Sequence, residues 1–133
     1  MDDMSQAQPA SDAGQHPLIF VVDDEPMLLD LAAAILEPLG YQVRKFRDPQ
    51  QALVEFTKAK PAVLVTDYAM GTMSGMDLVR ECKRVNPRQK IMLVSGTVDE
   101  HIFADAPVKP DTFIAKPYQV SNFIESVQKL AAG

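Results

Sequence analysis

The chain of 133 residues is long enough for one hydrophobic core and too short for two. Its composition, 47% hydrophobic and 23% charged residues, is that of an ordinary globular protein. The formal net charge of −5 argues against direct binding to nucleic acids or to anionic membranes, because both interactions need a basic surface.

The single cysteine, Cys82, cannot form an intramolecular disulfide and lies in a helical pattern, which predicts a buried, inert thiol. We find no signal peptide and no apolar stretch near the length of about 20 residues that crosses a bilayer, so we expect a cytoplasmic protein. With only His16 and His101 beside that cysteine, nitrogen and sulfur ligands for zinc are too few. A bound metal should therefore be one that prefers oxygen.

Residues 1–17 are polar and show no apolar periodicity, which predicts a disordered leader in front of one domain at residues 18–133. The domain begins with LIFVV at residues 18–22, an apolar run typical of a buried central strand. Three acidic residues follow this run directly: Asp23, Asp24 and Glu25.

The first helix is predicted to begin at Pro26, whose missing N–H costs little in the first turn, and to end before Gly40. We expect its buried stripe to consist of apolar residues at helical spacing: Met27, Leu28, Leu31, Ile35, Leu36 and Leu39. Residues 41–46 alternate in polarity and predict a half-exposed strand near the sheet edge. Asp48 and Pro49 then suit the N-cap and the first position of a second helix.

The next apolar run, residues 62–65, predicts a buried strand whose carboxyl end carries Asp67. After a glycine-containing loop, apolar residues at helical spacing predict a third helix over residues 75–85. Residues 91–94, IMLV, predict a fourth strand, which ends at Ser95.

Residues 98–104 have room for about two helical turns, but the prolines at positions 107 and 110 restrict this segment to a short or irregular element. Residues 112–115 predict a fifth strand that ends at Lys116, and residues 120–130 predict a last amphipathic helix. This alternation predicts an α/β fold, a doubly wound five-stranded parallel sheet with helices on both faces.

Four of the five predicted strands end next to residues that can take part in chemistry: Asp23 with Asp24, Asp67, Ser95 and Lys116. The carboxyl ends of parallel strands share one sheet edge, so these residues should meet there. Three carboxylates close together repel one another unless a cation or a proton intervenes. Lys116 supplies one positive charge, and Mg²⁺, which binds carboxylate and phosphate oxygens, would supply the remainder.

An aspartate beside a divalent cation, a hydroxyl and a lysine is suited to phosphoryl transfer. The Asp67 carboxylate can attack phosphorus to form an aspartyl phosphate, while the metal and the ammonium stabilise charge on the transferring oxygens. Each residue also has a purely structural interpretation: Asp23 and Asp24 could cap the first helix, Ser95 could end a strand and Lys116 could be a solvated charge. Their joint arrival at one sheet edge favours the chemical interpretation.

Four segments, in this order and spacing, closely resemble the receiver domain of two-component response regulators, which includes single-domain chemotaxis regulators: VVDDEP, LVTDYAMGTMSGMDL, LVSGT and FIAKP. The resemblance covers residues 18 to about 132. It implies a flavodoxin-like sheet with the strand order 2-1-3-4-5. It also implies a cis peptide bond between Lys116 and Pro117.

The resemblance further implies a role for each residue of the site. Asp67 would accept the phosphoryl group, and Lys116 and Ser95 would bind it. The ligands implied for Mg²⁺ are Asp24, Asp67, the Ala69 carbonyl oxygen and, through water, Asp23. Ser95 and Phe113 would form the switch that responds to phosphorylation.

The chain departs from the family pattern in three places. Gly71 stands where the loop after the acceptor usually carries proline, so this loop should be more flexible. Ala69 and Thr97 occupy the positions that modulate how water reaches the acyl phosphate in this family. The proline-broken segment after Thr97 falls on the face that receivers commonly present to partners.

The leading interpretation is a signalling domain that catalyses only its own phosphorylation and dephosphorylation. It would receive the phosphoryl group from a sensor histidine kinase or a histidine phosphotransfer protein and signal to a downstream protein. One alternative is a receiver-like module that binds partners without phosphorylation. An aspartate-nucleophile phosphatase of the haloacid dehalogenase type would need a second acid at Ala69. A flavodoxin-like FMN carrier would bring phosphate against the three acids that follow the first strand.

Overall fold

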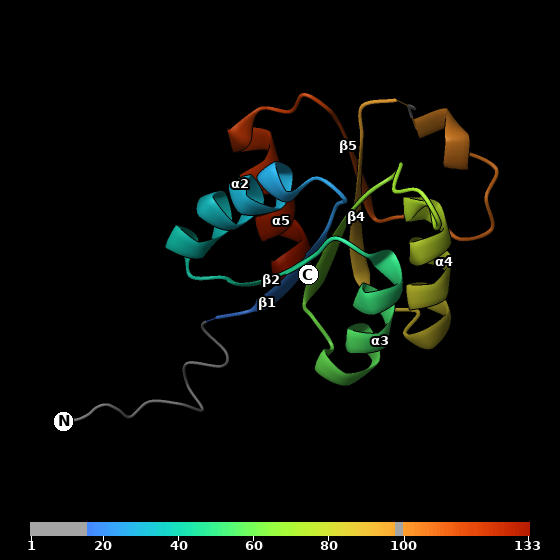
Figure 1. The fold of residues 1–133 in the computed structure, drawn as a ribbon, viewed down its shortest axis with the longest axis horizontal. Coiled ribbons are helices and arrows are strands. Elements are labelled where there is room, and N and C mark those ends of the chain that lie inside the picture. Colours follow the sequence, from blue (N-terminus) through green and yellow to red (C-terminus); the bar gives the residue numbers. More distant parts are fainter. Residues whose placement is uncertain (1–15, 98–99) are drawn as a thin grey trace.

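The computed structural model describes residues 16–97 and 100–133 as a five-stranded parallel sheet flanked by helices (Figure 1). The strands are β1 (Leu18–Val22), β2 (Gln42–Phe46), β3 (Val63–Asp67), β4 (Lys90–Ser95) and β5 (Thr112–Ala115). The helices are α2 (Pro26–Leu36), α3 (Pro49–Ala59), α4 (Gly75–Val85) and α5 (Val120–Ala132), with the 3-10 turns η1 (Glu37–Leu39) and η2 (Glu100–Phe103). The strand order β2-β1-β3-β4-β5 confirms the predicted topology and fold class. The leader expected at residues 1–17 lies outside the described residues, apart from His16 and Pro17.

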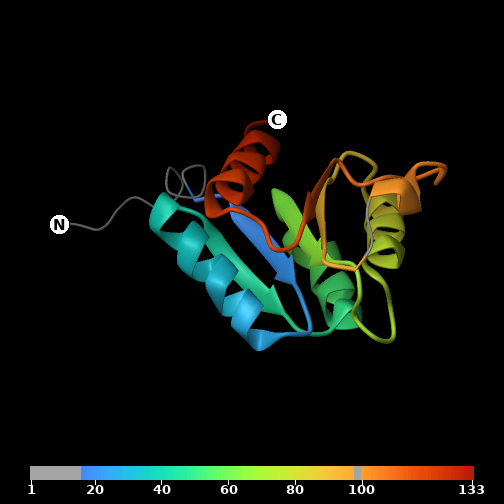
Figure 2. The same ribbon diagram turned by 90° about the horizontal axis from the view of Figure 1, so that it is seen from above.

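The alternation of side chains along the strands divides the core into two layers. Val21 and Val65 belong to the layer that packs with α2 and α5, whereas Phe20 and Leu64 belong to the layer that packs with α3 and α4. Figure 2 shows one pair of helices on each face of the sheet. The inner strands β1, β3 and β4 are therefore buried on both faces, as their uninterrupted apolar runs predict.

The buried face of α2 differs from the predicted stripe. Met27 and Leu31 are 82% and 44% exposed, and Leu39 is exposed as well, so the prediction that they face the core is wrong. The residues that α2 buries are Leu29, Ala32, Ala33 and Leu36. Because this helix is apolar almost all round, its sequence allows more than one inward face, and packing against the sheet selects one. The chain then turns at Gly40, whose φ of 98° is the left-handed conformation that glycine adopts readily.

Two helices begin with side-chain caps. The Gln50 N–H donates to Asp48 Oδ1 at 2.9 Å, which confirms Asp48 as the N-cap of α3. Helix α4 begins with a capping box that the sequence analysis did not identify, although its Ser-x-x-Asp spacing is visible in the sequence. In this box the Asp77 N–H donates to Ser74 Oγ at 3.1 Å, and the Ser74 N–H donates to Asp77 Oδ2 at 3.1 Å.

Between β4 and β5 the described residues form a short helical element and irregular chain, as the prolines predict. The helical element is η2, a turn of four residues, and Val98 and Asp99 lie outside the described residues. The Phe103 ring of η2 lies 5.8 Å from the Phe113 ring of β5, measured between ring centroids. This ring contact joins η2 to β5, the edge strand of the sheet, and it is the ring contact of η2 within the described residues.

Cys82 is fully buried in α4, and burial raises the pKa of its thiol to about 12. This confirms the predicted buried thiol, and at neutral pH almost none of it is the reactive thiolate. In residues 16–97 and 100–133, no helix has the length and apolar character needed to cross a membrane.

Gly75, the first residue of α4, packs tightly against the loop that follows β3. The Gly75 N–H donates to the Tyr68 carbonyl oxygen at 2.7 Å. A Cβ atom at this position would collide with the Asp67 carbonyl oxygen and would lie 2.8 Å from Leu93 Cδ1. The absence of a side chain therefore allows α4 to start directly beneath Asp67.

We expect Gly75→Ala to lower the free energy of unfolding by about 1–3 kcal/mol, because the added methyl group must displace backbone atoms. Urea unfolding followed by circular dichroism measures the difference. Gly96→Ala is the control, since its Cβ would meet nothing closer than 3.4 Å. Equal losses in the two variants would contradict the proposed close packing at Gly75.

The capping box also predicts a pH dependence. Hydrogen bonding from the Ser74 N–H, and then the Arg80 side chain, lower the pKa of Asp77 below its ordinary value of 3.8. A carboxyl with a lowered pKa in the folded state stabilises the fold above its unfolded pKa, and this stabilisation is lost as the pH falls through the folded value. Asp77→Asn should therefore be less stable than the parent by about 0.5 kcal/mol at pH 7.

Urea unfolding at pH 7 and at pH 2 tests this dependence, and the difference between parent and Asp77→Asn should nearly vanish at pH 2. The exposed Asp105 offers a matched control, because it lies outside a capped helix. At pH 7 its asparagine variant should differ from the parent in stability by less than Asp77→Asn does. A difference for Asp77→Asn that does not change with pH would show that the charge of Asp77 has no role.

Candidate functional site

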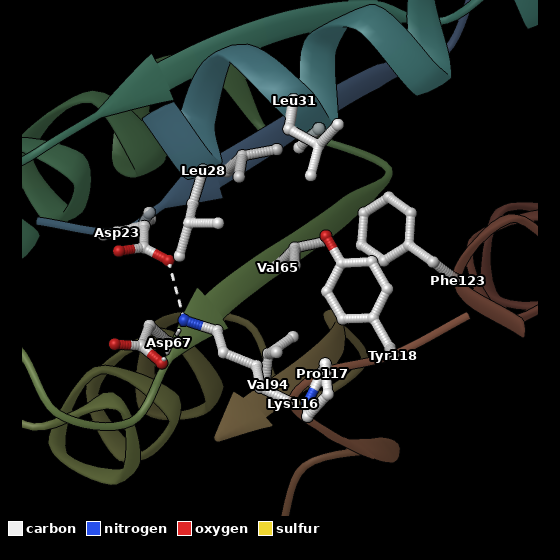
Figure 3. Close-up of a pocket in the computed structure, with 13 residues that line it drawn as sticks. Asp23, Leu28, Leu31, Val65, Asp67, Val94, Lys116, Pro117, Tyr118 and Phe123 are labelled. Atoms are coloured by element: carbon white, nitrogen blue, oxygen red, sulfur yellow. Dashed lines mark hydrogen bonds and ion pairs between the residues drawn. The ribbon is translucent and has the colours of Figure 1, made fainter. Parts of the chain in front are cut away.

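Three strand ends bring charged side chains together at the carboxyl edge of the sheet. Asp23 follows β1, Asp67 is the last residue of β3 and Lys116 follows β5. Each lies two residues beyond a core residue of the layer that packs with α2 and α5, namely Val21, Val65 and Ile114. Because side chains along a strand alternate between faces, all three emerge on the same face and point toward one another (Figure 3).

The Lys116 ammonium lies between the two carboxylates. Lys116 Nζ is 3.1 Å from Asp67 Oδ1 and 3.2 Å from Asp23 Oδ2. The side chains of Asp67 and Lys116 are only 11% and 22% exposed, so water screens this contact poorly. The second oxygen of Asp23, Oδ1, accepts a hydrogen bond from the Glu25 N–H at 3.0 Å. Asp23 is therefore held on both sides.

The third carboxylate, Asp24, is exposed and completes an acidic cluster. One oxygen from each of Asp23, Asp24 and Asp67 lies within 4.8 Å of the others. Three carboxylate oxygens at this separation form a donor set for a hard, oxygen-bound cation. One ammonium against three carboxylates leaves the cluster negative, so the residues present fit a divalent ion such as Mg²⁺.

The pKa of Asp67 is raised, first of all because the carboxylate is buried. Burial raises the pKa of Asp67, and the charge of Asp23 raises it further, against the opposing effects of Lys116 and the Tyr68 N–H. Burial by itself would lower the pKa of Lys116, but its contacts with Asp67 and Asp23 raise it on balance. The ammonium therefore stays charged, and it does not fully offset the cost of burying the Asp67 carboxylate.

Ser95 lies at the same edge, at the end of β4, and is 1% exposed. Its Oγ accepts a hydrogen bond from the Thr97 N–H at 3.2 Å and lies 3.5 Å from Thr97 Oγ1. The Lys116 N–H donates to the Ser95 carbonyl oxygen at 2.8 Å. These contacts connect Ser95 both to the lysine of the site and to the segment that leads toward η2.

Phe113 lies apart from the acidic cluster. It is half-buried on β5, opposite Leu93 in the sheet register, and its ring packs against Phe103. Phe103 was not singled out in the sequence analysis. Its sequence signal is the apolar pair Ile102–Phe103, which follows three polar residues, Asp99, Glu100 and His101.

A backbone hydrogen bond ties the start of the loop after Asp67 to β4. The Tyr68 N–H donates to the Val94 carbonyl oxygen at 2.9 Å. Ala69 is exposed, and Gly71 has a φ of 79°, which proline cannot adopt. Glycine at position 71 therefore allows a backbone conformation that proline would exclude. The peptide bond between Lys116 and Pro117 is cis, as the resemblance implies.

Arg47 is a residue near the site that the sequence analysis missed. Its Nη2 and Nε lie 3.3 and 3.4 Å from the Asp24 carbonyl oxygen, so it holds the acidic turn after β1. The Asp23 N–H donates to the Phe46 carbonyl oxygen at 3.0 Å, which fixes the same turn to β2. The sequence contains an indication of this position, because Arg47 directly follows β2 and so lies at the shared carboxyl edge.

The sequence matches a known protein family over most of its length. The family described as response regulator receiver domain matches residues 19–128. Chemotaxis protein CheY of Thermotoga maritima is 25% identical over 115 residues, which are 85% of this chain and 96% of CheY. The nitrogen assimilation regulatory protein NtrX of Azorhizobium caulinodans is 33% identical over 110 residues, 80% of this chain and 24% of NtrX.

The length of the relatives varies. The probable transcriptional regulatory protein TcrX of Mycobacterium tuberculosis is 26% identical over 119 residues, 88% of this chain and 50% of TcrX. The chain thus spans half or less of TcrX and NtrX but nearly all of CheY.

Solved structures with the same fold include two of similar length. A response regulator receiver domain protein from Clostridium thermocellum matches with a TM-score of 0.80 and 26% identity, over 87% of this chain and 94% of the other. TrrA of Thermotoga maritima, solved in complex with Mg²⁺ and BeF, matches with a TM-score of 0.76 and 25% identity, over 86% and 98% of the two chains. With its family match over most of the sequence and its five-stranded fold, the chain belongs to the response regulator receiver domain family of two-component signalling.

Proposed function

We propose that Asp67 accepts a phosphoryl group from a phosphohistidine of a sensor histidine kinase or a histidine phosphotransfer protein. The observation that carries this proposal is the 3.1 Å contact between Asp67 Oδ1 and Lys116 Nζ inside a cluster of three carboxylates. The structure of TrrA in complex with Mg²⁺ and BeF supports it, because the present chain shares that fold at 25% identity.

In the proposed reaction an Asp67 carboxylate oxygen forms a bond to phosphorus. The phosphorus–nitrogen bond of the donor breaks, and its electron pair returns to the imidazole ring. The Lys116 ammonium donates hydrogen bonds to the phosphoryl oxygens, where negative charge collects. Hydrolysis of the aspartyl phosphate would end the signal. Water attacks phosphorus, the oxygen–phosphorus bond to Asp67 breaks, and inorganic phosphate is released. The domain would catalyse only these two reactions on itself.

The acidic cluster would hold Mg²⁺ during this reaction. The metal would neutralise negative charge on the carboxylates and on the incoming phosphoryl oxygens. Asp24, Asp67 and the Ala69 carbonyl oxygen would bind it directly. Asp23 would act through water, which is supported by the two contacts that already occupy its oxygens, with Lys116 and with the Glu25 N–H.

Ser95 and Phe113 would carry the signal away from the site. In the phosphorylated protein the Ser95 hydroxyl would donate to a phosphoryl oxygen. Because Ser95 Oγ accepts a hydrogen bond from the Thr97 N–H, such a movement would also shift the segment after β4. Phe113 packs on Phe103, so a turn of its ring would reach η2. A downstream protein that binds this side of the sheet would respond to both changes.

The proposed unit of function is the receiver domain at residues 18–133, preceded by a leader at residues 1–17. The net charge of −5 favours protein partners over direct contact with nucleic acid or with a membrane. We place the protein in the cytoplasm, where histidine kinases present their phosphohistidine. The alternative, a module that binds its partner without phosphorylation, differs in one measurable way, because its affinity would not respond to BeF and Mg²⁺.

Phosphorylation is tested by incubating the protein with phosphoramidate and Mg²⁺ and measuring intact mass. The parent should gain the mass of one phosphoryl group, and Asp67→Asn should gain none, because the amide is not a nucleophile toward phosphorus. Asp105→Asn removes an exposed carboxylate away from the site and should label like the parent. Equal labelling of Asp67→Asn and the parent would contradict the assignment of Asp67.

Metal binding is tested by thermal unfolding with and without Mg²⁺. At a free Mg²⁺ concentration of roughly a hundred times its Kd, the metal should stabilise the parent by about 2.7 kcal/mol, seen as a rise in Tm. Asp24→Asn should lose most of this rise, and because Asp24 is exposed and outside the Lys116 contacts, the metal-free variant should stay folded. Asp105→Asn should keep the rise. A Tm that does not respond to Mg²⁺ in the parent would count against the metal site.

A further inference from the structure

A cavity of about 360 Å³ opens beneath the acidic cluster, between α2 and the start of α5 (Figure 3). Its floor is formed by Val65 and Val94 of the sheet, and its α2 wall includes Leu28 and Ala32. The volume lies at the small end of the range of ligand pockets, so it suits a molecule with a single ring. The proposed phosphorylation of Asp67 does not account for such an apolar chamber.

The opposite wall of the cavity is aromatic. Tyr118, two residues after Lys116, stacks on Phe123 of α5 with ring centroids 4.9 Å apart and an interplanar angle of 14°. Figure 3 shows the phenol oxygen of Tyr118 directed toward Val65, across the cavity. Burial raises the pKa of Tyr118, so its hydroxyl stays protonated at neutral pH. Two electron-rich rings and one hydroxyl therefore line this side.

The mouth of the cavity carries net negative charge. Asp23 and Asp67 both line it, and the only cation among the described lining residues is Lys116. The ammonium of Lys116 lies between the two carboxylates, so a second cation would find carboxylate oxygens still poorly neutralised. An anionic ligand would meet two carboxylates at the same place.

We propose that this cavity binds a small organic cation, a primary amine that carries one aromatic ring. The ring would fill the apolar chamber beside Tyr118 and Phe123, and the ammonium would lie at the mouth against Asp23 and Asp67. Aromatic rings pack favourably against one another, and a carboxylate forms strong charge-assisted hydrogen bonds with an ammonium group. The same two carboxylates belong to the metal cluster, so the amine and Mg²⁺ would compete.

Binding is measured on the full chain by titrating 2-phenylethylamine and following backbone amide shifts in two-dimensional NMR. Saturable shifts should appear at Val65, Tyr118 and Phe123. Two probes of similar shape test the charge, and 2-phenylethanol and phenylacetate should each bind about tenfold or more weakly than the amine. Equal binding of all three probes, or no saturable shift with the amine, would overturn the proposal.

A matched pair of variants on α2 tests the location. Ala32→Met places a longer side chain into the cavity and should weaken amine binding by about tenfold or more, whereas Ala34→Met adds the same atoms to the exposed face of α2 and should leave it unchanged. If Ala32→Met does not fold, Leu28→Trp at the half-buried cavity wall replaces it with the same expectation. Equal affinity in the cavity variant and Ala34→Met would overturn the location.

Competition with the metal tests where the ammonium lies. Adding Mg²⁺ should raise the apparent Kd of 2-phenylethylamine, and NaCl at the same ionic strength should raise it less. An effect of NaCl equal to that of Mg²⁺ would overturn the placement of the ammonium at Asp23 and Asp67. Because amine binding is measured without a phosphodonor, failure of this proposal leaves the labelling of Asp67 untouched, and the reverse also holds.

Discussion

The site depends on the two contacts that the Lys116 ammonium makes with the carboxylates of Asp67 and Asp23. Two carboxylates buried this close together repel each other strongly, and without a cation one of them would be driven to take up a proton. A single ammonium removes part of that repulsion, but Asp24 adds a third negative charge beside it. The site is therefore prepared for one further cation. A metal ion and an organic ammonium would meet the same carboxylates, which makes their competition a direct consequence of the charge balance.

The alternation of side chains along parallel strands explains why the acidic site and the cavity share one face of the sheet. Asp67 and Lys116 each continue, by two residues, the apolar layer that packs against α2 and α5. The cavity opens where this layer ends, so its apolar floor leads directly to the carboxylates. Ser95 comes one residue after Val94 of that layer and therefore has the opposite orientation. Its contacts with Thr97 connect the same edge to the segment that leads to η2. Ser95 and the acidic cluster are therefore directed to opposite sides of the sheet at this edge.

Much of the fold could be predicted from the sequence, because uninterrupted apolar runs and well-placed glycines, prolines and caps act locally. The helix at residues 75–85 and the strand at residues 112–115 have the predicted boundaries. The capping box at Ser74 and the position of Arg47 after β2 also have local signals in the sequence, a Ser-x-x-Asp spacing and a cation at a strand end. The inward face of α2 could not be predicted from periodicity, since a helix with apolar residues on nearly every side has no single stripe.

The amino-acid sequence alone indicates which residues stand at the strand ends, and hence that carboxylates, a hydroxyl and a lysine meet at one edge of a parallel sheet. That follows from local pattern and from the geometry shared by all such sheets. Three features are visible only in the folded molecule: Lys116 lies between Asp67 and Asp23, Met27 and Leu31 of α2 face outward, and a cavity remains beneath the site. These features depend on how helices of particular side-chain sizes settle on the sheet. Contacts between residues far apart in the chain fix that packing, and no local pattern of residues records it.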